Sequence, residues 1–368
     1  MRLRSLDVFR GLTMAGMVIV NNPGDWSAVY SPLLHAAWHG WTPTDLIFPA
    51  FLFIVGAALA LAGPERHRPA AVLRRGALLI ALGLFLSGFP YFNPERWRIP
   101  GVLQRIGLCY VVAALLWRRL AVPGDTAATA RRLVTATAAC LLGYWALLML
   151  VPPPGGSAGD LTADGNLGAW LDRAVFGTHL WKTTWDPEGL LSSLPAVGTT
   201  LMGVVAGLWI GRARPACVAP SLVYAGAGAM IVGTLWDTVL PINKSLWTSS
   251  YALFTGGASM LALGVLHRRL DDGRSTPTID RLSEPFVTLG RNALLLFVVS
   301  GLVAKSLLLL TVAGPGGTVV SLQRWLYLAA FAPVAPPQLA SLLYATANLG
   351  LLYGLLVWQH RRRIYWSV

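Results

Sequence analysis

The sequence predicts an all-α, polytopic integral membrane protein, and three observations lead to this class. The 368 residues are 55% hydrophobic and only 12% charged, with a mean hydropathy of +0.58, so there is too little polar surface to cover a soluble domain. Apolar runs of about 20 residues recur from end to end, as a hydrocarbon core of ~30 Å requires of helices. Arginines gather in alternate loops between these runs. We therefore expect one transmembrane domain over residues 1–368.

The charge pattern orients the predicted helices. A net charge of +13 would suit a nucleic-acid-binding protein, but these arginines alternate with the apolar runs and follow the positive-inside rule. We therefore expect the arginine-rich loops and both termini in the cytoplasm, membrane lipids as the surroundings, and no nucleic acid as a partner. The arginines that define the inner side are Arg2, Arg4, Arg66, Arg68, Arg74, Arg75, Arg118, Arg119, Arg131, Arg132, Arg212, Arg214, Arg268, Arg269, Arg274 and Arg281.

About ten helices are expected to cross the membrane. The first is a retained span and not a cleaved signal, because it contains Asp7 and Arg10 and ends without a small-residue cleavage pattern. Residues 319–331 include Gln323 and Arg324 and fall short of the ~17 residues that a span needs, so an outer interfacial or re-entrant helix is expected there. The predicted spans are residues 6–20, 43–62, 70–88, 100–118, 133–151, 189–212, 220–239, 246–268, 285–310 and 338–359.

Ionisable residues within or beside a span are costly and mark candidate functional sites. Asp7 and Arg10 share a helix face at the inner side, where they either neutralise each other or help to hold a phosphate-bearing ligand. Arg74, Arg75 and Arg291 lie at the same side. Arginine recognises phosphate well, so this side is the candidate site for an anionic ligand.

The segment from His35 to Asp45 is the main candidate at the outer side. Thr42, Pro43 and Asp45 are typical of a helix start, and Asp45 could simply complement the helix dipole. Two histidines and a carboxylate within eleven residues exceed what a cap needs: a histidine can accept a proton near neutral pH, and a carboxylate can orient it. Interfacial packing is the alternative. A metal site is not expected, because His35 and His39 lack further ligands nearby.

Three further outer segments carry polar candidates. Arg105 and Glu188 either tie two helices together or line a polar acceptor cavity. Lys244 and Trp247 stand with Asn243 and several hydroxyl groups at another helix start, a mixture that could bind a sugar by stacking and hydrogen bonding. An aromatic belt would explain Trp247 alone but would not explain Lys244.

Taken together, these motifs resemble the heparan-α-glucosaminide N-acetyltransferase family, including its shorter bacterial members. The resemblance extends over nearly the whole chain and rests on six segments in the same order. They are RSLDVFRG (4–11), VN (20–21), HAAWHGWTPTDLIFP (35–49), RIPGVLQR (98–105), DPEG (186–189) and NKSLW (243–247), and RRRIYW (361–366) is similar to the family's basic and aromatic end.

The resemblance implies a transmembrane acetyltransferase in a bacterial inner membrane. The donor would be cytoplasmic acetyl-CoA, and the acceptor a glucosamine-type amino sugar or a glycan at the outer face. His35 would be the catalytic histidine, acting as general base or as acetyl carrier, with Asp45 and Asn21 as its partners. His39 departs from the asparagine expected at its position and is expected to be a bystander. Arg10, Arg74, Arg75 and Arg291 would bind acetyl-CoA, and Arg105, Glu188, Lys244 and Trp247 the acceptor.

Two other functions remain open at this stage. An O-acyltransferase acting on an envelope glycan would use the same donor. A sugar transporter would also carry polar residues in its spans, although the internal repeat typical of transporters is not evident. A homodimer is compatible with the sequence, because spans rich in glycine and alanine pack equally well within and between chains.

Overall fold

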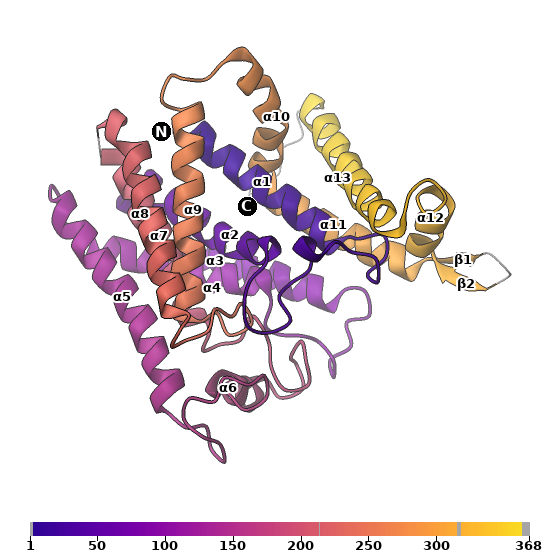
Figure 1. Ribbon diagram of the computed structural model, residues 1–368, viewed down its shortest axis with the longest axis horizontal. Coiled ribbons are helices and arrows are strands. Elements are labelled where there is room, and N and C mark those ends of the chain that lie inside the picture. The colour runs from indigo at the N-terminus through magenta and orange to yellow at the C-terminus, as the bar shows by residue number, and fades with distance from the viewer. Residues whose placement is uncertain (1–2, 213, 315–317, 363–368) are drawn as a thin grey trace.

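The computed structural model describes residues 3–212, 214–314 and 318–362. Within them the chain forms a bundle of α-helices with a single two-stranded antiparallel hairpin (Figure 1). The motif at residues 361–366 lies mostly outside the described residues. The helices are α1 (Arg4–Asn21), α2 (Ile47–Ala62), α3 (Pro69–Gly88), α4 (Val102–Leu120), α5 (Thr126–Leu150), α6 (Leu167–Phe176), α7 (Ser193–Arg212), α8 (Pro215–Trp236), α9 (Ser249–Leu270), α10 (Pro277–Arg291), α11 (Ala293–Leu309), α12 (Leu322–Ala330) and α13 (Pro337–Arg361), with short 3-10 helices η1 (Ser31–Leu33), η2 (Pro43–Leu46) and η3 (Pro64–Arg66) and strands β1 (Thr311–Ala313) and β2 (Val319–Ser321).

The all-α membrane class is confirmed. Seven helices in the described ranges are long and apolar enough to cross a membrane, and an eighth span is added if the bent pair α10 and α11 counts as one. The other two predicted spans also fold as helices, α1 with 18 residues and α4 with 19. They are more polar: α1 contains Asp7 and Arg10, and α4 contains Arg105. Of these charged residues, Arg10 lines the inner cavity described below.

Close helix packing in the core depends on small residues. In the pair α2 and α7, a Cβ atom added to Gly56 would lie 1.9 Å from the carbonyl oxygen of Thr200, and one added to Gly203 would lie 2.0 Å from the carbonyl oxygen of Phe53. The pair α8 and α9 meets in the same way at Gly226 and Gly257. Small residues allow two backbones to approach closely, which is how helices associate where lipid removes most of the hydrophobic driving force.

The predicted span over residues 285–310 is not one continuous helix. The chain forms two helices that meet at Asn292 with a bend of 74°. The break falls at Asn292, which leaves the helical conformation and donates its side-chain amide to the carbonyl oxygen of Thr288. Lys305 is the single charged residue of α11, which is the apolar part of the pair.

The outer segment near residue 319 differs in part from the prediction. Residues 319–321 form strand β2 and not the start of a helix, and α12 covers only nine residues. At 1.5 Å per residue α12 is about 14 Å long, too short to cross ~30 Å. It therefore fits the expected interfacial element, which projects at one edge of the bundle with the hairpin (Figure 1).

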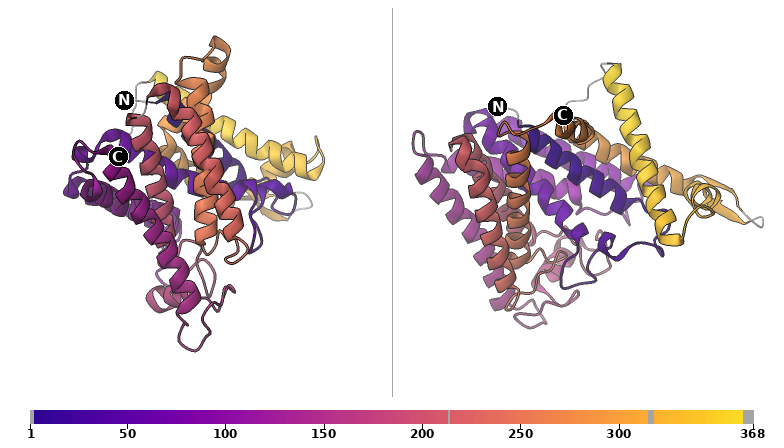
Figure 2. Two further views of the ribbon diagram at one scale, coloured as in Figure 1. Left: turned by 60° about the vertical axis from the view of Figure 1, so that its left-hand side comes forward. Right: turned by 45° about the horizontal axis from the view of Figure 1, so that its top comes forward.

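The start of α1 and the end of α13 lie at the same side of the bundle. Just after α1, Gly24 donates its backbone N–H to the carbonyl oxygen of Ser341 near the start of α13, so the two helices run in opposite directions. The right-hand view of Figure 2 shows this arrangement.

Replacement of Gly56 by alanine should destabilise the protein by about 1–3 kcal/mol, because the added methyl group would push α2 away from α7. Gly228→Ala in α8 is the matched control. A Cβ atom there meets nothing within 4 Å, so the helix should be unchanged or gain up to about 1 kcal/mol. Thermal unfolding in detergent measures both, and equal stability of the two variants would contradict the packing argument.

Candidate active site

The loop that carries His35 is anchored on the carboxylate of Asp45. Asp45 lies in η2 at the outer start of α2 and is fully buried. Its Oδ2 accepts hydrogen bonds from the backbone N–H of Ala36, at 3.1 Å, and of Thr42, at 3.0 Å. Thr42 in turn donates its hydroxyl to the carbonyl oxygen of Leu34. The loop is thereby fixed to the helix start at several points.

The second oxygen of Asp45 orients His35. Oδ1 lies 2.7 Å from Nδ1 of His35, and the imidazole side chain remains 50% exposed. Since a carboxylate only accepts hydrogen bonds, Nδ1 carries the proton in the neutral ring. The lone pair is then on Nε2, which is the arrangement that a general base or a nucleophile requires.

Lys244 completes this cluster. Its Nζ lies 3.0 Å from Nδ1 and 2.9 Å from Nε2 of His35, and 3.8 Å from Oδ1 of Asp45. Burial lowers the pKa of Lys244, while the carboxylates of Asp45 and Glu188 oppose this effect and favour the ammonium form. A cation is therefore held against the imidazole by two acids.

A tight turn presents Lys244. The side-chain oxygen of Asn243 accepts the backbone N–H of Leu246 at 2.8 Å, and its backbone N–H reaches the hydroxyl of Thr248. Trp247 adopts a φ of 51°, which is rare for a residue with a bulky side chain. Packing of its ring against Phe48 holds that conformation. A strained turn over-determined by its surroundings is a common feature of functional sites.

An ion-pair network adjoins Lys244. Arg98 makes a bidentate contact with Asp186, at 2.8 and 2.6 Å, and a further contact with Glu188. Its guanidinium also lies 4.9 Å from the ring centroid of Trp181. Glu188 bonds to Arg98 and also acts electrostatically on Lys244. Arg98 and Asp186 were not among the predicted site residues, although the two acids of the DPEG motif indicate that a basic side chain lies near them.

Two of the residues predicted to bind the acceptor sugar, Arg105 and Trp247, are buried in contacts within the protein. Arg105 is 2% exposed and donates to the carbonyl oxygens of Pro187 and Gly189 and to the hydroxyl of Ser192. The helix tie considered for Arg105 and Glu188 is thus made to the backbone, while Glu188 pairs with Arg98. Trp247 is 1% exposed and packs under the Arg105 guanidinium, so its ring offers no free face for stacking.

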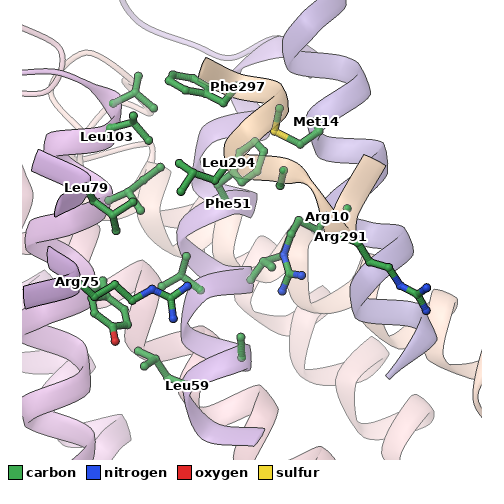
Figure 3. A pocket seen from close by; sticks show the side chains of 18 of the residues that line it. Arg10, Met14, Phe51, Leu59, Arg75, Leu79, Leu103, Arg291, Leu294 and Phe297 are labelled. Carbon is green, nitrogen blue, oxygen red and sulfur yellow. The ribbon is translucent and has the colours of Figure 1, made fainter. Parts of the chain in front are cut away.

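At the inner side a cavity of about 360 Å³ lies among α1, α2, α3, α4 and the bend between α10 and α11. Arg10 and Arg75 extend into it from opposite walls, whereas the guanidinium of Arg291 turns away (Figure 3). Arg75 lies over the ring of Tyr110, and no ion pair of Arg75 occurs in the described residues. Arg74, its neighbour, is exposed and does not line the cavity.

Asp7 holds the other two inner arginines. Its carboxylate lies 3.4 Å from Arg10 and 3.6 Å from Arg291. The structural pairing of Asp7 and Arg10 is therefore present, and it leaves Arg10 at the wall of the cavity. Of the four arginines considered for an anionic ligand, Arg75 and Arg10 have the most suitable positions.

A second cavity of about 310 Å³ continues from the first toward the outer side. Both are lined by Met14, Met17, Val102, Leu103 and Phe297, so they adjoin. The outer one is bordered by Asn21 and by Arg98. Asn21 makes no side-chain hydrogen bond to His35 among the described residues, and it lies along this route and not in the histidine cluster.

His39 stands apart from His35. Its Nδ1 lies 3.4 Å from the amide nitrogen of Asn243, and its ring meets Trp38 edge to face. It contacts neither the Asp45 carboxylate nor Lys244. The geometry favours His35 of the two histidines.

Comparison with known proteins identifies relatives of this chain. A family model described as heparan-alpha-glucosaminide N-acetyltransferase, catalytic, matches residues 2–158. The human heparan-alpha-glucosaminide N-acetyltransferase is 30% identical over an alignment of 358 residues, which covers 81% of this chain and 52% of the human protein. The mouse protein of the same name is also 30% identical, with 53% of its length covered.

This chain belongs to the heparan-alpha-glucosaminide N-acetyltransferase family. It spans about half the length of the curated relatives that it matches. The segment matched by the family model includes His35, Asp45 and Arg98 as well as the inner arginines Arg10 and Arg75. Glu188 and Lys244 lie beyond that segment and join the site through the fold.

A buried acid supports the outer loops of the site. Asp172 in α6 is 3% exposed and accepts the backbone N–H of Leu190 at 2.8 Å. Burial raises the pKa of Asp172 to about 6, and the nearby carboxylate of Asp186 adds to this effect. The folded state therefore binds the Asp172 proton more tightly than the unfolded chain does.

Protein stability should fall as pH rises from about 4 to about 6, because ionised Asp172 is disfavoured in the folded state. The loss is of the order of 2–3 kcal/mol. Asp172→Asn keeps the acceptor oxygen and removes the titration, so this contribution should disappear. Thermal unfolding in detergent from pH 4 to 7 measures it. Identical pH profiles of the variant and the unaltered protein would contradict the assignment.

Proposed function

We propose that this protein transfers an acetyl group across the membrane, from acetyl-CoA at the inner side to the amine of a glucosamine-type sugar at the outer side. The observation that carries the proposal is the pair of adjoining cavities, which lead from the inner arginines to Arg98. Arg98 bonds to Glu188, whose charge acts on Lys244 beside His35. A transferase that joins a cytoplasmic donor to an outer acceptor needs such a route. Family membership supports the same activity.

The inner cavity would hold the nucleotide end of acetyl-CoA. Its phosphates are anionic, and Arg75 is a cation at the cavity wall without a carboxylate partner in the described part of the chain. Arg10 would contribute a second cation, although it shares its charge with Asp7. The apolar walls from Met14 to Phe297 suit the pantetheine arm that connects the nucleotide with the thioester.

At the outer side His35 would act on the acceptor amine. Asp45 holds Nδ1 and leaves the lone pair of Nε2 exposed, so the imidazole can accept the proton that the amine loses on attack. The same lone pair could take up the acetyl group, in which case His35 is an acetyl carrier. Both routes require the Asp45 contact and an accessible Nε2.

Asn21 and Glu188 would have lesser parts. Asn21 lines the outer cavity and could contact the acetyl-bearing arm. Glu188 is 7% exposed at its side chain and bonds to Arg98, so it would hold the outer wall and the charge of Lys244.

Replacement of His35 by alanine should abolish acetylation of glucosamine, because the other members of the cluster are the fully buried carboxylate of Asp45 and the ammonium of Lys244, and neither offers the amine an accessible base. His39→Ala is the matched control and should retain most of the activity. Acetyl-CoA-dependent formation of N-acetylglucosamine in detergent or in vesicles measures both. Substantial turnover by His35→Ala would contradict the assignment of His35 as the catalytic histidine. Acetylation of a sugar hydroxyl but not of the amine would favour O-acyl transfer.

Replacement of Arg75 by alanine should weaken acetyl-CoA binding by roughly 10-fold to 100-fold, as expected for one charge-assisted contact to phosphate. The adjacent Arg74→Ala removes the same charge from an exposed position outside the cavity and should bind acetyl-CoA normally. Acetyl-CoA-dependent thermal stabilisation gives the affinities. An equal loss in both variants would point to the general charge of the inner surface and away from the cavity.

A further inference from the structure

The ammonium of Lys244 lies over the imidazole ring of His35. Its Nζ is almost equidistant from both ring nitrogens, at 3.0 and 2.9 Å. An atom in the ring plane at those distances would collide with the carbon between the two nitrogens, so the ammonium lies over the ring face. It therefore leaves the in-plane lone pair of Nε2 open while staying beside it.

The fold holds this cation firmly. The Lys244 side chain is 19% exposed, lies 3.8 Å from Asp45 and is within electrostatic reach of Glu188. Its backbone belongs to the tight turn built by Asn243 and fixed by buried Trp247. A preorganised charge of this kind costs no reorganisation during a reaction, which is the feature that makes electrostatic catalysis effective.

We propose that Lys244 is a catalytic residue that stabilises the oxyanion formed when the acceptor amine attacks the acetyl thioester. The inference deepens the proposed function and rests on it. An attacking nitrogen must lie about 2.6–3.2 Å from Nε2 for His35 to take its proton. The acetyl oxygen is only two covalent bonds from that nitrogen, so the developing negative charge falls next to Nζ of Lys244.

Acetyl transfer from the thioester to the amine passes through a tetrahedral intermediate. The amine nitrogen forms a bond to the acetyl carbon, and its proton passes to Nε2 of His35. The carbonyl electrons move to oxygen, where the ammonium of Lys244 stabilises the charge. When the tetrahedral intermediate collapses, the carbon–sulfur bond breaks, coenzyme A leaves, and the proton on His35 neutralises the thiolate. Lys244 donates a hydrogen bond throughout and keeps its proton.

This role differs from binding of the acceptor, which the sequence suggests for Lys244. A residue that only binds substrate lowers KM and leaves kcat unchanged, whereas one that acts on the transition state changes kcat. Asn21, which the family resemblance implies as a partner of His35, lines the outer cavity and makes no side-chain hydrogen bond to His35 in the described residues. Lys244 is in contact with both members of the His35 and Asp45 pair.

The test compares Lys244→Met with Lys244→Arg in the full-length protein. Lys244→Met should lower kcat by about 10²-fold to 10³-fold, the cost of losing one oxyanion donor. Its KM for glucosamine and its acetyl-CoA-dependent thermal stabilisation should be unchanged. Lys244→Arg keeps a cation and should recover part of kcat. Lys182→Met, which removes an exposed lysine from an outer loop, is the control and should behave like the unaltered protein.

Each outcome decides between the alternatives. A raised KM with unchanged kcat in Lys244→Met would overturn the proposal in favour of acceptor binding, and activity near that of the unaltered protein would overturn it altogether. If Lys244→Met does not fold, Lys244→Gln takes its place, since it keeps hydrogen bonding without the charge and should show the same loss of kcat. Absence of acetyl transfer by the unaltered protein is a different result and counts against the proposed function itself.

Discussion

The buried carboxylate of Asp45 is the interaction on which the outer site depends. A carboxylate taken out of water must have its charge satisfied by hydrogen bonds or by cations. Here the donors are His35 and two backbone N–H groups of the loop, and Tyr251 donates to the main-chain oxygen of Asp45. Satisfying one charge thus fixes the loop, the tautomer of the histidine and the position of the nearby lysine together.

The core supports this arrangement. Asp45 stands at the start of α2, and α2 packs against α7 through glycines that allow no movement inward. The turn that carries Lys244 leads directly into α9, whose buried Tyr251 reaches back to η2. The reacting groups therefore lie on loops, but the loops end on helices whose relative positions are set by backbone contact.

Acidic side chains hold the cations at the outer end of the molecule, whereas the bend between α10 and α11 shapes the inner end. At the outer end Arg98 is paired with Asp186 and Glu188, and Lys244 lies near Asp45 and within electrostatic reach of the same Glu188, so these charges are held in place. At the inner end the bend between α10 and α11 brings Gly290 and Ala293 to the cavity wall, so the broken helix itself forms the inner mouth. Arg4 ties α10 to α1 through Asp280 and Glu284, which keeps that mouth in shape.

The sequence by itself determined the class of the protein and the family, because length, apolar periodicity and local motifs are all present in the chain order. The sides of the membrane stay a prediction from arginine placement. The sequence also identified the contact of His35 with Asp45, since these residues belong to one loop and one helix start. Only the tertiary structure decided the rest. Arg105 and Trp247 are buried in the folded protein. The packing of segments that are distant in sequence places Lys244 against His35 and Glu188 against Arg98. The sequence also does not specify which face of a helix meets its neighbours. That face decides that the chain breaks at Asn292 and that Arg75, and not Arg74, lines the inner cavity.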